Sequence, residues 1–166
     1  MTFNWLAVAG AAFFPMIFGF IWYNPKVFGT AWMRASGLTE ESMKDANMVL
    51  IFGVSLILSF LLSLEMNFIA IHQNHVFSMV ANQPNYTDPT SPTGQWLTQV
   101  MAAYGNNFRT YKHGALHGAI AGLFFVLPVL GINALFERKS FKYIAINTGY
   151  WVICLAFMGA VISHFK

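Results

Sequence analysis

Apolar residues fill four long stretches of the chain, and polar residues gather between them. The stretches run over about 3–23, 46–71, 114–136 and 143–165. Each is as long as the roughly 20 residues that a helix needs to cross the hydrocarbon core of a bilayer. The pattern therefore predicts an all-α, polytopic membrane protein, in which four transmembrane helices form a compact bundle. We expect a single membrane domain over residues 1–166.

The polar stretches predict the connections between the spans. Prolines and polar residues make 82–94 an irregular loop. Thr39, followed by Glu40 and Glu41, predicts the N-cap and first turn of the helix that carries the second span. At its other end, that helix is expected to continue through residues 72–77.

Composition indicates a chain that is surrounded largely by lipid. Hydrophobic residues make up 57% and charged residues 9%, whereas typical soluble proteins have about 25% charged residues. The net charge of +3 is too small and dispersed to suggest a nucleic-acid partner, and a single cysteine, Cys154, excludes an intrachain disulfide. Ala7-Val8-Ala9 resembles a signal-peptide cleavage site, but no basic residue precedes it and the apolar run continues past it. A retained membrane helix is therefore the better interpretation.

Basic residues favour one orientation in the membrane. If both termini lie outside, the inner loops hold Lys26, Arg34, Lys44, Arg138, Lys139 and Lys142, and the outer side holds Arg109, Lys112 and Lys166. Basic residues are enriched in cytoplasmic loops. The count therefore predicts that both termini and the 72–112 connection lie on the outer side.

Histidines are the most specific candidates for chemistry. In a four-span protein all of them lie at the same membrane face: His72, His75, His113, His117 and His164. Imidazole suits zinc, copper and iron, so a transition-metal site is one hypothesis. A haem held by two histidines from facing helices is a second, and a proton relay with Glu65 is a third. The alternative without a ligand is that histidine is simply suited to the membrane interface.

Glu65 is the only acidic residue within a predicted span. A carboxylate at the centre of a membrane helix costs about 2.5–3.5 kcal/mol on insertion scales, so it usually faces protein or water. On a continuous helix, His72 would project within about 20° of Glu65. Glu65 could handle protons or cations, or it could simply bond to a neighbouring helix or extend to the interface.

Small residues at spacing four predict close helix packing. One row is Gly114, Gly118 and Gly122, and the other is Ser55, Ser59 and Ser63. Small side chains let helix backbones approach each other, and serines can hydrogen-bond between helices. The glycines are expected to face the serine row or the small residues of the fourth span, and both rows indicate assembly rather than chemistry.

Several motifs resemble those of the domain-of-unknown-function 1761 family, over most of the chain outside the proline-rich loop. This resemblance implies a small bacterial integral membrane protein with four helices, and a bacterial inner membrane is the expected location. It implies no activity. The motifs are Gly19-Phe20-Ile21-Trp22-Tyr23-Asn24-Pro25, Phe28-Gly29, Ala31-Trp32-Met33, His113-Gly114, His117-Gly118, Phe136-Glu137-Arg138-Lys139-Ser140, Ile146-Asn147 and Gly149-Tyr150-Trp151.

Patterns typical of enzymes are missing from the sequence. It has no HExxH, CxxC or GxSxG pattern and no phosphate-binding glycine loop, so no catalytic residue is predicted. The leading hypothesis is a non-catalytic accessory or assembly protein that packs against other membrane proteins or a second copy of itself. The alternative is a transporter or a metal- or haem-binding membrane protein that uses Glu65 and the histidines.

Overall fold

The computed structural model describes residues 3–165, and within that range every regular element is helical. This confirms the predicted all-α fold. The elements are α1 (Trp5–Ala11), α2 (Phe14–Trp22), α3 (Gly29–Ser36), α4 (Glu40–Lys44), α5 (Met48–Ala70), α6 (Gln73–Val80), α7 (Pro92–Tyr104), α8 (Tyr111–Ala121), the π-helix η1 (Gly122–Val126), α9 (Leu127–Phe136) and α10 (Phe141–His164).

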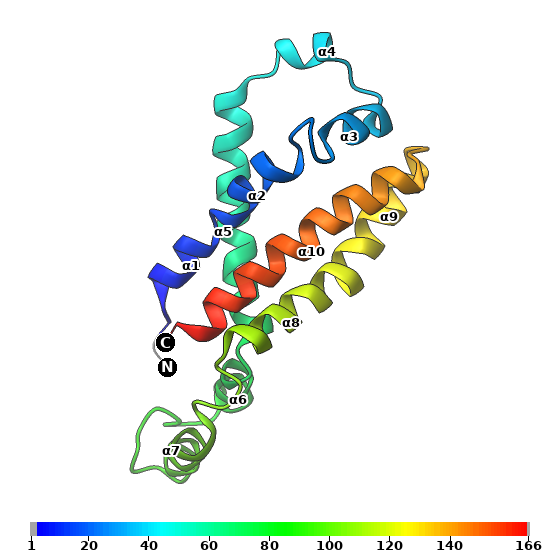
Figure 1. The fold of residues 1–166 in the computed structure, drawn as a ribbon. Coiled ribbons are helices and arrows are strands. Elements are labelled where there is room, and N and C mark those ends of the chain that lie inside the picture. Colours follow the sequence, from blue (N-terminus) through cyan, green and yellow to red (C-terminus); the bar gives the residue numbers. More distant parts are fainter. Residues whose placement is uncertain (1–2, 166) are drawn as a thin grey trace.

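Four helical segments are long and apolar enough to cross a membrane: Trp5–Trp22, Met48–Ala70, Tyr111–Phe136 and Phe141–His164. They pack against one another (Figure 1), so the four-helix membrane architecture is confirmed. Both described chain ends lie at one end of the bundle, beside the start of α8 and the end of α5. We call this the terminal end, and the opposite end, with α3, α4 and the α9–α10 turn, the loop end.

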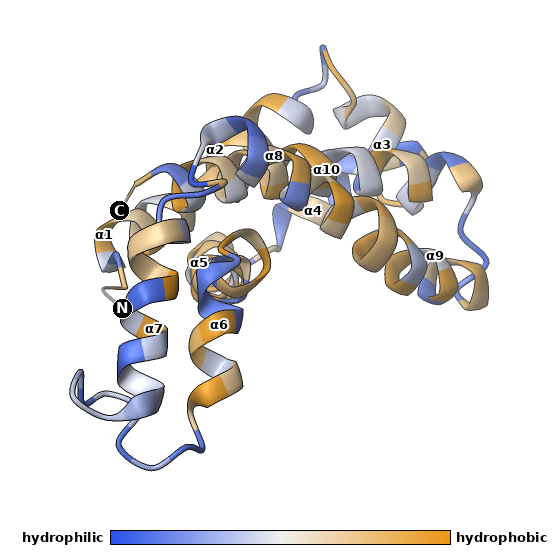
Figure 2. Cartoon of the chain, turned by 90° about the horizontal axis from the view of Figure 1, so that it is seen from below, coloured by the Kyte–Doolittle hydropathy of each residue, from blue (hydrophilic) through white to orange (hydrophobic). Residues whose placement is uncertain are grey.

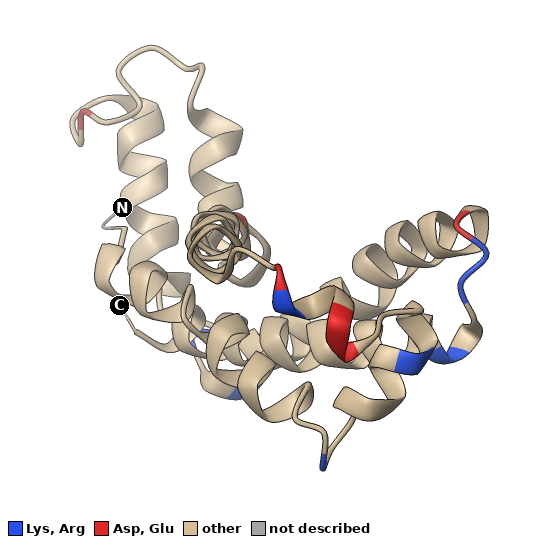
Figure 3. Ribbon diagram, turned by 90° about the horizontal axis from the view of Figure 1, so that it is seen from above, with Lys and Arg blue, Asp and Glu red and all other residues tan. Residues whose placement is uncertain are grey.

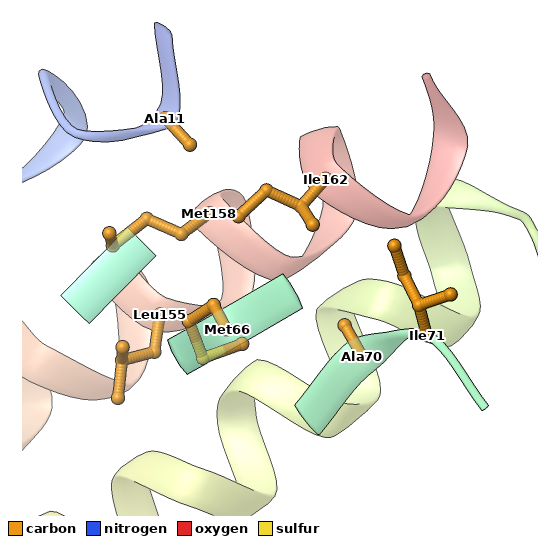
Figure 4. Packing of buried hydrophobic residues seen from close by; sticks show 7 residues of the cluster. All are labelled: Ala11, Met66, Ala70, Ile71, Leu155, Met158 and Ile162. Carbon is orange, nitrogen blue, oxygen red and sulfur yellow. The ribbon is translucent and has the colours of Figure 1, made fainter. Parts of the chain in front are cut away.

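The core of the bundle is built around α10. Half of this span is buried, compared with 11% of the span in α5 and 11% of the span that begins with α8. Side chains from α1, α5 and α10 meet near the terminal end (Figure 4). The buried cluster consists of Ala11, Met66, Ala70, Ile71, Leu155, Met158 and Ile162.

The glycine row places α8 directly against α10. A Cβ atom added at Gly114 would overlap the carbonyl oxygen of Gly159, and one added at Gly118 would overlap that of Leu155. At Gly122 it would lie 2.7 Å from the Cα of Val152. The glycines therefore face the fourth span and not the serine row.

The serine row of α5 does not face the glycine row and contacts a different helix. Ser59 and Ser63 are buried, and the Ser63 hydroxyl donates a 2.7 Å hydrogen bond to the carbonyl oxygen of Val8 in α1. Ser55 is half-buried. Ser63 thus joins α5 to the first span.

Prolines alter two spans that were predicted as single helices. The first span, expected over 3–23, is divided into α1 and α2, because Pro15 near the start of α2 has no N–H to continue the ladder. In the third span, Pro128 lies near the start of α9, directly after the π-helix η1. A π-helical turn is one way in which a helix accommodates such a break.

The predicted 72–112 connection is largely helical, which corrects two expectations. Ile71 has an extended backbone (φ −114°, ψ 100°), so α5 ends at Ala70 and does not continue through residues 72–77. Ser91 accepts a hydrogen bond from the Gly94 N–H and caps α7, so the end of the predicted irregular loop 82–94 belongs to a helix. Figure 2 shows α6 and α7 side by side, with α7 the more hydrophilic.

At the loop end, the Thr39 cap is present but begins a shorter helix than expected. Its side chain accepts a hydrogen bond from Ser42, but α4 ends at Lys44 and α5 has a separate cap, Asn47. Most of the charged residues that Figure 3 colours lie at this end, and the spans are nearly free of them.

Candidate metal site

Three of the five histidines meet at the terminal end. His72, His113 and His117 each offer a ring nitrogen, and these three nitrogens all lie within 4.8 Å of one another. The Nε2 atoms of His72 and His113 are 2.7 Å apart, so one ring donates a hydrogen bond to the other. His72 is exposed, and the other two rings are half-buried.

Two of these rings are placed by the first turns of α8. The side chain of Thr110 accepts a hydrogen bond from the His113 N–H and fixes where the helix begins. His117 follows one turn later, on the same helix face. The ring centroids of His113 and His117 lie 4.6 Å apart.

The third ring comes from the corner between α5 and α6. Ile71 is buried in the core, and its extended backbone ends α5 at that point. The side-chain N–H of Asn74 donates to both the carbonyl and the side-chain oxygen of Asn67, at 2.8 and 2.7 Å. These bonds hold the corner, and His72 projects from it towards α8, with its ring centroid 4.9 Å from that of His117.

Phe108 covers the histidines, and no sequence pattern pointed to it. Its ring centroid lies 4.8 Å from that of His113 and 5.6 Å from that of His72. It also has a positive φ of 62°, which is strained for a bulky side chain. The Ser163 hydroxyl donates a 3.2 Å hydrogen bond to the Phe108 carbonyl, which helps to keep this conformation.

Two further side chains secure the turn that carries Phe108. Gln73 Nε2 donates to the carbonyl oxygens of Tyr104 and Asn107, both at 2.9 Å. The Arg109 guanidinium donates from Nε to the carbonyl oxygen of Ser163 and from Nη2 to that of Phe165, at 2.7 and 2.8 Å. The turn is thus tied to α6 on one side and to the end of α10 on the other.

The remaining predicted residues do not belong to this cluster. His164 stacks on Tyr111, with ring centroids 3.7 Å apart and planes at 16°, and His75 lies exposed on α6. Glu65 is exposed on α5, and the break at Ile71 removes the helical register that would align it with His72. We therefore expect the metal-ligand set to contain three of the five histidines.

The environment of His72 favours its neutral form. Desolvation lowers the pKa of His72, and the nearby rings of His113 and His75 lower it further. A neutral imidazole is the form that binds a metal.

The family model described as a protein of unknown function (DUF1761) matches residues 6–163, nearly the whole chain. The chain belongs to the DUF1761 family. Comparisons with curated proteins and with solved structures gave no match. Membership assigns no activity to the three histidines.

The spacing of the nitrogens in this DUF1761 protein suits a small ion. Zinc–nitrogen bonds of about 2.0–2.1 Å in a tetrahedral site place ligand nitrogens about 3.3 Å apart. The Nε2 atoms of His72 and His113 are 2.7 Å apart, and all three ligand nitrogens lie within 4.8 Å of one another. Small ring rotations, easiest at the exposed His72, would bring all three nitrogens to a common ion.

A large groove lies elsewhere in the DUF1761 bundle. It has a volume of about 830 Å³, lies between α2, α5 and α10 and is lined mostly by apolar side chains. Tyr23 and Tyr150 contribute hydroxyls, but these bond to Asn147 and to the Pro15 carbonyl. No histidine, cysteine or carboxylate is among the residues that line the groove.

Proposed function

We propose that this membrane protein binds a transition-metal ion at its terminal end through His72, His113 and His117. The observation that carries the proposal is the set of three ring nitrogens within 4.8 Å, contributed by the α5–α6 corner and by α8. Sequence position alone puts five histidines at one membrane face, whereas the fold selects three of them. Small ring rotations would bring the selected three to the spacing that one ion requires.

The donor set favours zinc or copper over harder cations. All three ligands are imidazoles, which suit zinc, copper and iron, whereas calcium and magnesium prefer oxygen ligands. No carboxylate from the described residues belongs to the cluster. A haem is disfavoured, because a 2.7 Å separation of the His72 and His113 nitrogens leaves no room for a flat macrocycle between them.

The open geometry supports exchange of the ion rather than a structural role. Structural zinc sites are closed by four protein ligands, whereas sites with three protein ligands keep a position for water or another molecule. Here three ligands are present, and one of them, His72, is exposed. We propose that the protein captures and releases a metal ion at the membrane surface. The positive-inside count favours the outer side for that surface, and we propose that the membrane is a bacterial inner membrane.

Metal binding by the purified protein tests this proposal. A chain with a tag free of histidine, reconstituted in lipid nanodiscs and stripped with a chelator, should bind one zinc or copper(II) ion. His113→Ala and His117→Ala should each weaken binding by about 10- to 100-fold. His75→Ala and His164→Ala are matched controls, because they remove one imidazole each from the same membrane face and should leave affinity unchanged.

Thermal unfolding provides a second readout. A ligand present at 100 times its dissociation constant stabilises the folded state by about 2.7 kcal/mol, so zinc should raise the melting temperature of the wild type and of His75→Ala. It should raise that of His113→Ala by less, because a site that is about 10- to 100-fold weaker gains only about 0.4–1.4 kcal/mol at the same zinc concentration. Equal metal affinity in His113→Ala and the wild type would disprove the site.

An accessory role in membrane assembly is a second candidate. What supports it is the uncovered apolar surface, since only 11% of the span in α5 and of the span that begins with α8 is buried. Lipid alone can cover such a surface. Crosslinking in native membranes would test the role, and a chain that forms no crosslinked product would argue against it.

A further inference from the structure

The surface of α5 that faces away from the bundle carries a regular stripe with one acidic residue in it. The stripe consists of Val54, Leu58, Leu61, Glu65 and Phe68, all exposed. The steps between these residues alternate between four and three, which is the spacing of a coiled-coil seam. Such a seam lets two helices pack along their whole length.

Glu65 places a carboxyl group in this stripe, and the hydrocarbon chains of lipid offer it no hydrogen bond. It lies five residues before the last residue of α5, or about 7.5 Å along the helix axis. Among the described residues, none forms an ion pair or a hydrogen bond with its side chain. Carboxylates within membrane spans usually face protein or water, yet the flanking stripe residues Leu61 and Phe68 are apolar and exposed. A polar group from outside the monomer would resolve this conflict.

A second copy of the chain supplies that group at the right depth. Copies inserted in the same orientation place identical residues at the same level of the bilayer, and a two-fold contact brings a residue near its own counterpart. Two carboxyl groups can hydrogen-bond to each other when one of them carries a proton. The other exposed polar side chains of the described spans lie near the span ends, including Tyr111 and Lys112 at the terminal end and Asn133 towards the loop end.

We propose that α5 forms the interface of a parallel dimer of this chain, in which the two Glu65 side chains hydrogen-bond to each other. A single polar residue in an apolar seam commonly fixes the register and the number of helices. Glu65 would set the register, and the neighbouring stripe residues would supply the packing. The interface shares no residue with the histidine cluster, so it does not depend on metal binding.

Cysteine crosslinking of the full-length protein in native membranes tests the dimer. The only native cysteine, Cys154, is buried, so the wild type gives the background. Leu61→Cys should form a dimer with a short bis-maleimide reagent. Phe124→Cys is the matched control, because Phe124 is 76% exposed on η1 and lies outside the stripe; it should crosslink no more than the wild type.

Changes at Glu65 then test the carboxyl group. Glu65→Gln can still hydrogen-bond and should keep the dimer, whereas Glu65→Leu should lower the dimer fraction of Leu61→Cys about three- to tenfold. His113→Ala should have no effect, which separates this interface from the metal site.

Three results would overturn the proposal. One is equal crosslinking at Leu61→Cys and Phe124→Cys, and another is an unchanged dimer in Glu65→Leu. The third is a crosslinked product that contains a different protein, identified by mass spectrometry, because α5 would then bind another partner.

Discussion

Replacing Gly118 by alanine should separate the two best-packed helices of the bundle. The added Cβ would overlap the carbonyl oxygen of Leu155 and lie 2.7 Å from the Cα of Ala156. Both contacts are with backbone, so no side chain can rotate away. Ordinary contact requires about 3.5 Å or more, and α8 would have to move away from α10 by about 1 Å.

The expected loss of stability follows from that displacement. A gap of about 0.5–1 Å removes a quarter to a half of the dispersion energy between atoms that were in contact, and overpacking typically costs about 1–3 kcal/mol or more. Alanine also favours the helix over glycine by about 1 kcal/mol. Because the clash is with backbone, the overpacking cost lies at or above the top of that range, and after the helix gain we expect Gly118→Ala to lower the free energy of unfolding by about 2 kcal/mol or more.

Gly131→Ala is the control for this measurement. Gly131 is also a buried helical glycine of the third span, but a Cβ there would lie 3.8 Å from Ile144 Cγ2, which is ordinary contact. Gly131→Ala should therefore be neutral or up to about 1 kcal/mol more stable. Both variants can be compared by reversible unfolding in mixed micelles with increasing dodecyl sulfate, followed by circular dichroism. If the two free energies agree within about 0.5 kcal/mol, the close approach of α8 and α10 at Gly118 does not exist in the protein.

Two further predictions concern the turn over the histidines. Phe108→Ala should speed the release of zinc to a competing chelator several-fold, because the ring covers His72 and His113. The rate is measured by stopped-flow absorbance, with Phe108→Leu as the control that keeps a bulky side chain over the rings. Equal release rates in Phe108→Ala and Phe108→Leu would contradict this. Arg109→Ala should lower the free energy of unfolding by about 1–3 kcal/mol, because it removes two charge-assisted hydrogen bonds to the carbonyls at the end of α10. Arg109→Lys should recover less than half of that loss, since one ammonium group cannot reproduce both bonds of the guanidinium fork; full recovery would refute this explanation in the same denaturation assay.

The architecture was predictable because membrane spans have a strong local signal. Long apolar runs without charges require helices in lipid, since every backbone group must be satisfied within the segment. The ends of the spans were less certain. Thr110 begins α8 earlier than the apolar pattern suggested, and Pro15 divides the first span. Both effects depend on single residues rather than on average hydropathy.

The candidate site was only partly predictable, for a different physical reason. Topology alone brings five histidines to one membrane face, but which rings meet depends on side-chain direction. The break at Ile71 turns His72 towards α8, and Ile71 is buried in the core, a tertiary contact without a local signal in the sequence. The stacking of His164 on Tyr111 likewise depends on how α8 and α10 pack. Phe108 could not be found, because its position depends on bonds from Gln73 and Ser163, which are distant in sequence.

The corner at Ile71 also has a mechanical consequence. His72 belongs to the short joint through which the α6–α7 hairpin attaches to the bundle, whereas His113 and His117 belong to a rigid helix. An ion bound by all three would link the α5–α6 corner to α8. Metal occupancy would then limit how far the hairpin can swing. Binding or release of the ion would therefore change the range of angles that the proline-rich loop 82–94 can take relative to the bundle.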